Sequence, residues 1–340
     1  MTAVQTVTGP VPAAELGLTL PHEHLANDIR SAVRPPRDPE LNWLREAKTA
    51  PDIAWLLREE PYACLDHCVL DDARATEADL TAFAEAGGRT VIDLTPPGIG
   101  RNPEALRGFA ERTGVRIVMG SGWYLEPFHP AGISVTGEQE LAAGLVAEFS
   151  GPGIRPGVIG EIGVSPDFTP DEHKTLRAAA RAQRETGVPL FVHLPGWQRR
   201  AHEVLDIVLG DYGVAPEAVV LCHMDPSGED GGYQRAVAER GVWLEFDMIG
   251  MPFTYPGEGT SPPPDRTALA IAELVHNGHE RQLLLSHDVF LKSMLTTYGG
   301  NGFRYVPTLF AQRLAELGVS AGELLTTNPA RLFAAAAKGN

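Results

Sequence analysis

The segment PGVIGEIGVSPDFTPDEHKTLRAAARAQRETGVPLFVHLPG, residues 156–196, contains the pattern of a strand, a helix and a second strand. Both ends of the segment are short and almost continuously apolar, which is typical of parallel strands that are buried on both faces. The Ala- and Arg-rich middle favours a helix, and Gly187 follows it where glycine commonly ends helices. The segment therefore predicts one β-α-β unit of a parallel sheet.

The same alternation runs along nearly the whole chain. Eight apolar stretches are strand candidates, and they cover residues 17–25, 89–96, 115–124, 156–165, 188–196, 218–226, 241–250 and 281–290. Helical patterns rich in Ala, Leu and Glu lie between them. Strand followed by helix, repeated eight times, predicts an α/β fold, a (β/α)8 TIM barrel, as one domain over residues 1–340. An open doubly wound sheet is the alternative, but Gly98–Gly100 continue as RNPEAL and do not complete a dinucleotide-binding turn.

The composition of the chain argues against some classes of binding partner. The 340 residues are 43% apolar, and 28 basic against 44 acidic residues give a net charge of −16 without a basic stripe. This balance argues against nucleic-acid and anionic-membrane partners. No apolar run approaches the length of a membrane span, and the N-terminal residues do not resemble a signal peptide. With only three cysteines, we expect reduced thiols and a cytoplasmic location. We also expect a small-molecule substrate and a homodimer.

One cysteine-containing motif could be a metal-binding site. Cys64, His67 and Cys68 lie in the sequence CLDHC, which offers two thiols and an imidazole. Their spacing also suits one face of a helix, and no second ligand pair lies nearby, so a structural zinc site is the less favoured interpretation.

Polar residues recur at the predicted strand ends. In PHEH, His22 and His24 share one face of the first strand and Glu23 points to the other. The remaining members of this set are Glu161, His193, His223 and Asp288. Individually they have ordinary explanations: a hydrogen-bonded core histidine, a carboxylate paired with arginine, or an aspartate that caps a helix. Together, four histidines and two carboxylates at the C-terminal ends of barrel strands predict two metal ions that share a carboxylate, with His287 as a competing ligand to Asp288.

The motifs in their order resemble the phosphotriesterase family of the amidohydrolase superfamily. The resemblance rests on GPVPAAELGLTLPHEHL, GRNPEALRGFAERTGVRIVMGSGWY, GVIGEIG, LLLSHDV and TTNPARLF, and it covers nearly the whole chain. It implies that His22, His24 and Asp288 hold the buried metal, that His193 and His223 hold the more exposed one, and that Glu161 bridges them. Namesake phosphotriesterases bridge with a carboxylated lysine, so Glu161 is closer to the phosphotriesterase-related branch.

The expected reaction is hydrolysis with two divalent ions, zinc first, then manganese, cobalt or a similar ion. Asp288 is the candidate to take the proton of the attacking water and deliver it to the leaving group. Tyr124 matches a position that contacts substrate in lactonases of the family; the alternative is a rim aromatic. Arg101, Arg266 and Lys292 could hold an anionic group of the substrate, although structural salt bridges explain each as well.

We expect the substrate to be a small lactone or carboxylic ester. An N-acyl amide is the alternative, with phosphotriester hydrolysis as a side activity. A barrel that binds a ligand without turnover is the alternative outside the enzymes. Loops that follow barrel strands form the mouth of the active site, and here they include the long insertion 26–70 and the segments 251–265 and 291–306.

Overall fold

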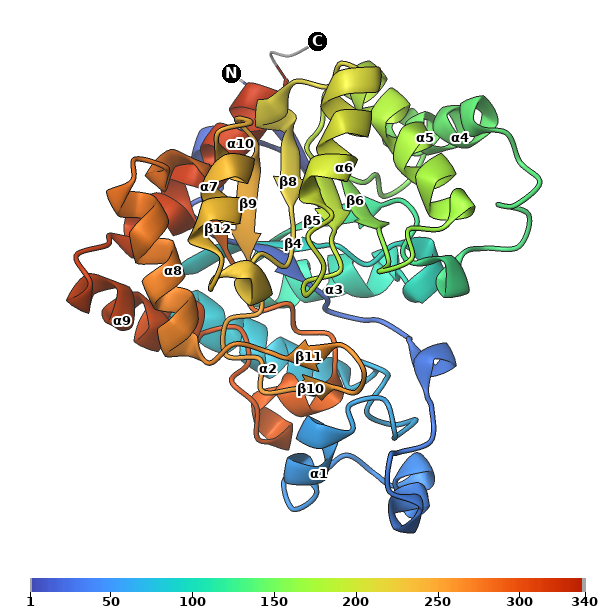
Figure 1. Cartoon of the computed structure of the whole chain (residues 1–340), viewed down its shortest axis with the longest axis vertical. Helices are drawn as coiled ribbons and strands as arrows, with labels where there is room; N and C mark the ends of the chain where they lie inside the picture. Colours follow the sequence, from blue (N-terminus) through green and yellow to red (C-terminus); the bar gives the residue numbers. More distant parts are fainter. Residues whose placement is uncertain (1, 338–340) are drawn as a thin grey trace.

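The computed structural model describes residues 2–337 and shows a nearly closed barrel of eight parallel strands surrounded by helices (Figure 1). The strands are β3 (Leu18–Glu23), β4 (Gly88–Asp93), β5 (Arg116–Ser121), β6 (Val158–Gly163), β7 (Leu190–His193), β8 (Val219–Leu221), β9 (Trp243–Phe246) and β12 (Leu283–Leu285). Each strand pairs in parallel with its neighbour in the chain, so the predicted barrel and all eight predicted strands are confirmed. Met1 and residues 338–340 of the predicted domain lie outside the described residues.

The first and last strands meet at a seam where Glu23 joins them. Its buried carboxylate accepts hydrogen bonds from the Ser286 hydroxyl at 2.8 Å and from the backbone N–H groups of His287 and Val289 at 3.0 and 2.8 Å. Backbone bonds from Asp288 to His22 and from His24 to Val289, both 3.2 Å, cross the same seam. This explains why Glu23 points away from the two histidines beside it.

The helices between the strands confirm the apolar periodicity of the sequence. They are α1 (Ala54–Glu59), α2 (Ala73–Glu85), α3 (Pro103–Thr113), α4 (Glu138–Ser150), α5 (Pro170–Thr186), α6 (Ala201–Leu205), α7 (Gly231–Ala238), α8 (Pro264–His276), α9 (Ala311–Glu316) and α10 (Asn328–Ala336). In α5, Thr169 and Glu172 form a capping box at the start, and Gly187 ends the helix in the left-handed conformation with φ 68°. The capped helix carries the chain directly from β6 to β7, which both bear predicted site residues.

Two hairpins were not predicted. Strands β1 (Ala3–Thr6) and β2 (Gly9–Pro12) pair before the barrel begins, and the Val7 N–H that follows β1 donates to Ile117 O of β5 at 2.9 Å. Each is only four residues long and β2 contains two prolines, so neither has the long apolar run that identified the other strands. Strands β10 (Thr254–Tyr255) and β11 (Gly259–Thr260) form a second hairpin inside the predicted loop 251–265. In Figure 1 this hairpin and α1 lie at one end of the barrel and α10 at the other.

The CLDHC motif of the insertion 26–70 forms turns rather than a helix, so the expectation of one helix face is wrong. His67 is fully buried, and its two ring nitrogens contact Pro61 O at 2.9 Å and Ser293 Oγ at 2.7 Å. Among the described residues, the groups able to hold a metal ion do not include Cys64 or Cys68, and the three cysteines are free thiols. His67 therefore fastens the insertion to the loop after β12. Within residues 2–337, no helix is long and apolar enough to cross a membrane.

Candidate metal centre and pocket

The barrel brings the six predicted metal ligands together at the C-terminal ends of its strands. His22 lies in β3 and His24 directly after it, Glu161 in β6, His193 at the end of β7, His223 after β8 and Asp288 after β12. All six are buried except His193, which is half-buried. Gly120 allows β5 to approach β6 closely here, because a Cβ atom on Gly120 would lie 2.3 Å from Gly160 O.

The Glu161 carboxylate is at the centre of the cluster. Its Oε2 lies 2.9 Å from His193 Nδ1, 3.6 Å from His22 Nε2 and 3.7 Å from His223 Nε2. Its Oε1 lies 3.6 Å from His24 Nε2. Asp288 Oδ1 is 3.2 Å from His24 Nε2 and 3.7 Å from His22 Nε2. One carboxylate therefore faces all four histidines, and the second faces the two from the first strand.

One unpaired ring nitrogen and one close pair of ring nitrogens indicate that this cluster suits metal ions. His22 Nε2 is buried and has no hydrogen-bond partner among the described residues, while its Nδ1 contacts two carboxylates. His193 Nδ1 and His223 Nε2 point at each other across 2.7 Å. Buried lone pairs without a donor are costly, and a cation between them removes the cost. Imidazoles and carboxylates at this spacing are ligands of zinc and similar ions.

Two of these residues have an unusual backbone. His223 has φ 60° and Asp288 has φ 51°, in the left-handed region that residues other than glycine seldom adopt. The His223 N–H donates to both oxygens of Asp247 at 3.1 and 3.0 Å, and the Asp288 N–H donates to His22 O. Such conformations persist only where surrounding contacts hold them, and they concentrate at functional sites.

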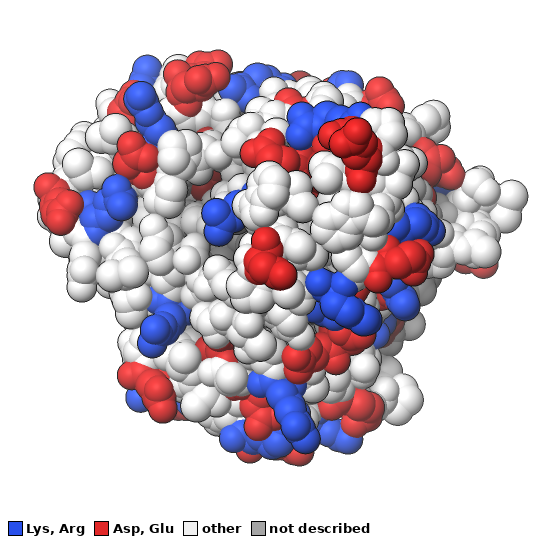
Figure 2. Space-filling model, turned by 90° about the horizontal axis from the view of Figure 1, so that it is seen from below, with Lys and Arg blue, Asp and Glu red and all other residues white. Residues whose placement is uncertain are grey.

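A pocket of about 300 Å³ opens onto the cluster, lined by His24, Glu161, His193, His223 and Asp288. The rest of its lining is largely apolar and includes an aromatic wall formed by Tyr62, Tyr124, Phe128, Trp197 and Tyr255. The Tyr124 ring packs edge-on against His193 with ring centres 4.9 Å apart. Figure 2 views the molecule from the end that carries α1 and the β10–β11 hairpin, where uncharged residues fill much of the surface and acidic and basic side chains are intermixed. The pocket thus suits a small, largely apolar molecule.

Comparison with known proteins agrees with this arrangement. Residues 2–333 match the model of the phosphotriesterase family. The chain belongs to the phosphotriesterase family. An N-acetyltaurine hydrolase from Tetraodon nigroviridis is 32% identical over 337 residues, 96% of each chain. Among solved structures, a resiniferatoxin-binding protein from Rhodobacter sphaeroides is 46% identical with a TM-score of 0.96, covering 100% of this chain and 97% of that one. A lactonase from Listeria monocytogenes is 25% identical with a TM-score of 0.77, covering 98% and 99%. The family match, the N-acetyltaurine hydrolase and the lactonase confirm the predicted hydrolase class.

In this phosphotriesterase-family barrel, His287 does not belong to the cluster of candidate metal ligands. Its Nδ1 lies 2.7 Å from Glu23 Oε1, and its Nε2 accepts a hydrogen bond from the Val306 N–H at 2.9 Å. Both ring nitrogens are therefore used on the outer side of the seam. The neighbouring Asp288 is the residue that faces the histidines.

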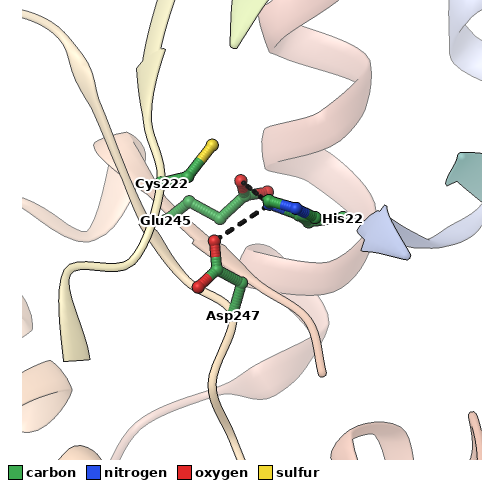
Figure 3. A group of neighbouring side chains, drawn as sticks. All are labelled: His22, Cys222, Glu245 and Asp247. Atoms are coloured by element: carbon green, nitrogen blue, oxygen red, sulfur yellow. Dashed lines mark hydrogen bonds and ion pairs between the residues drawn. The ribbon is translucent and has the colours of Figure 1, made fainter. Parts of the chain in front are cut away.

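Sequence reasoning missed two carboxylates beneath the cluster, Glu245 in β9 and Asp247 directly after it. Figure 3 shows both pointing toward His22, with Cys222 beside them. Burial raises the pKa of Glu245 to about 7. Burial also acts to raise the pKa of Asp247, but the charges and hydrogen bonds of His223 and His22 outweigh it and hold that pKa well below its usual range. The signal was present in WLEFDM, where two acids interrupt an apolar strand as Glu161 does in β6.

The three cationic candidates lie elsewhere. Arg101 pairs with Glu148 at 2.8 Å, and the buried Lys292 pairs with Asp71 at 2.7 Å. Arg266 is exposed at the start of α8. The basic residue that lines the described pocket is instead Arg34 of the insertion, whose guanidinium lies 5.2 Å from the centre of the Tyr62 ring.

Proposed function

We propose that this protein is a two-metal hydrolase that cleaves a small acyl compound, in the first place a lactone or carboxylic ester. The observation that carries the proposal is the central Glu161 carboxylate, which faces four imidazole nitrogens beside the unpaired His22 Nε2. His22, His24 and Asp288 would hold one ion, His193 and His223 the other, and Glu161 both. The ligand types favour zinc, with manganese or cobalt as substitutes.

Two ions held by these residues would supply a water molecule of lowered pKa and a positive charge for the carbonyl oxygen of the substrate. Asp288 then has the role of accepting the proton of the attacking water and giving it to the leaving oxygen or nitrogen. Its side chain is mostly buried but lines the pocket, so it can meet both the water and the substrate. The aromatic wall holds the apolar part of the substrate and excludes bulk water.

An N-acyl amide is the second candidate. It is favoured by several N-acetyltaurine hydrolases that are 30 to 32% identical over nearly the whole chain. Phosphotriester hydrolysis would be a side activity of the same centre. A barrel that binds without turnover remains the alternative outside the enzymes, and the name of the Rhodobacter sphaeroides relative describes a binding protein.

A set of substrates that differ in the bond to be cleaved distinguishes these functions. Protein stripped with a chelator is reloaded with Zn²⁺, Mn²⁺ or Co²⁺ and assayed on a lactone, an aryl ester, an N-acyl amine and a phosphotriester. We expect two equivalents of metal and metal-dependent turnover, fastest on the ester and lactone. Faster turnover of the amide selects the second candidate. Two bound ions without any turnover would favour the binding protein.

Variants of Glu161 test the bridge directly. Glu161→Ala removes the central carboxylate, so metal content and turnover should fall together. Glu161→Gln keeps the size of the side chain but removes its charge, so it should impair turnover with a smaller loss of metal. Elemental analysis and thermal melts on both variants check this prediction. Lower stability with two equivalents still bound would show an ordinary structural carboxylate.

A further inference from the structure

Asp247 contacts one histidine from each half of the proposed metal centre. Its Oδ1 lies 2.8 Å from His223 Nδ1, and its Oδ2 lies 3.0 Å from His22 Nδ1. The carboxylate is fully buried below the cluster and also accepts the backbone N–H of His223. The side chain therefore lies behind two potential ligands that come from β3 and from the end of β8 (Figure 3 shows its contact with His22).

These contacts determine which nitrogen each ring offers to the pocket. An ionised carboxylate only accepts hydrogen bonds, so both histidines must donate through Nδ1–H. When Nε2 binds a metal ion, each ring is neutral and uses the lone pair of that nitrogen. Both Nε2 atoms face Glu161, at 3.6 Å for His22 and 3.7 Å for His223. His193 differs, because its Nδ1 is the nitrogen that faces Glu161.

We propose that Asp247 is a positioning residue shared by both metal ions, through which the affinities of the two sites depend on one side chain. The inference rests on the proposed two-metal function. Hydrogen-bond partners behind a metal-binding histidine fix its tautomer and orientation, and they make it a stronger ligand. Because Asp247 does this for a ligand of each ion, its loss weakens both sites together.

The neighbouring carboxylates do not share this arrangement. Glu245 Oε2 lies 3.1 Å from His22 Nδ1, and its other oxygen has no hydrogen-bond partner among the described residues. Asp225 Oδ2 accepts the backbone N–H groups of Asp247 and Met248 at 3.0 and 3.1 Å, so it shapes the loop after β9. Glu245 thus supports the His22 side alone, and it provides a matched control.

The test compares metal binding by the wild-type protein, Asp247→Asn and Glu245→Gln after chelator treatment. Each protein is titrated with Zn²⁺ against a chromophoric chelator, and Co²⁺ absorption reports the ligand geometry of each equivalent. Asp247→Asn removes the negative charge from both Nδ1–H contacts and leaves an oxygen for only one of them, so it should weaken both equivalents, each by about 10- to 100-fold. Glu245→Gln should weaken one equivalent and change one part of the Co²⁺ spectrum.

The outcomes separate the inference from the function on which it rests. A wild-type protein that binds no metal would overturn the proposed function. Two wild-type sites together with an Asp247→Asn variant that keeps both, or loses only one as Glu245→Gln does, would overturn the shared role alone. If Asp247→Asn does not fold, ¹⁵N NMR of histidine-labelled wild-type protein decides: His22 and His223 must be protonated at Nδ1. A Zn²⁺-loaded protein in which either ring lacks the proton on Nδ1 would contradict the proposal.

Discussion

Asp288 and His287 are adjacent in sequence but have different environments: Asp288 faces the candidate metal ligands, and His287 contacts the seam between the first and last strands. Asp288 Oδ1 lies 3.2 Å from His24 Nε2, whereas both nitrogens of His287 contact the seam and Val306. Asp288→Asn should lower kcat/KM on every substrate, because proton transfer alone contributes about 10²- to 10⁴-fold. Steady-state kinetics on a lactone and an aryl ester measure this loss.

His287→Gln is the matched control for Asp288→Asn. We expect it to lower the melting temperature, since about 1–3 kcal/mol is typical when a buried hydrogen-bonding group loses its partner. Its metal content should stay at two equivalents. The reverse result, with His287→Gln losing metal and Asp288→Asn retaining turnover, would assign the ligand role to His287.

We expect Tyr124 to contact the substrate, because it lines the pocket beside the same centre. Burial, together with the nearby Glu161 charge, raises the pKa of its phenol, so the hydroxyl remains a neutral donor over the working pH range. Tyr124→Phe should lower kcat/KM for a lactone by up to about tenfold, in line with one hydrogen bond of roughly 0.5–1.5 kcal/mol. An ester with an activated leaving group should change little. Equal losses on both substrates would indicate that the ring matters only through packing on His193.

At the scale of elements, the insertion 26–70 is held to the barrel by His67. Its Nε2 lies 2.7 Å from Ser293 Oγ, and its backbone oxygen accepts the Lys292 N–H at 3.0 Å. Burial, with a smaller effect from the Lys292 charge, lowers the pKa of this imidazole to about 4. The folded protein therefore keeps His67 neutral at pH values where the unfolded chain, with a pKa near 6.5, binds a proton.

This difference makes the stability depend on pH. Stability from a neutral His67 is fully present above about pH 6.5 and is lost as the pH falls toward 4, because the unfolded state then takes up the additional proton. His67→Gln should be less stable at pH 8 and should show a shallower loss between pH 6.5 and 4. Urea unfolding at several pH values measures both effects. Parallel curves for the two proteins would mean that His67 does not titrate in this range.

The elements themselves differ in how far their sequence specifies them. The eight barrel strands were predictable because both faces are buried, which makes each strand continuously apolar. The β1–β2 hairpin was not predictable, since its strands have only four residues each, β2 contains two prolines, and the hairpin contacts β5. In the site, the six residues stood out as polar positions at apolar strand ends. Asp247 was missed because its role depends on two histidines from other strands, a relation that one strand's sequence does not contain.

At the scale of the whole molecule, bound ions should stabilise the barrel, because the proposed ligands come from five different strands or strand ends. A ligand that binds only the folded state adds about 2.7 kcal/mol at a concentration of 100 times its Kd. Chelator treatment should therefore lower the melting temperature, and Zn²⁺ should restore it. Glu161→Ala should melt at nearly the same temperature with and without Zn²⁺. A chelator-insensitive wild-type melt would count against ions that bind within the fold.

The seam fastened by Glu23 has a consequence for synthesis of the protein. His22 and Ser286, whose backbone and hydroxyl meet there at 3.1 Å, are 264 residues apart in sequence. A chain emerging from the ribosome presents His22 and His24 early. Asp288 and the partners of Glu23 leave the ribosome only after the other seven barrel strands have been made. A chain truncated before β12 lacks both the closing contacts and one proposed ligand. Retention of a full complement of ions would therefore distinguish finished chains from incomplete ones.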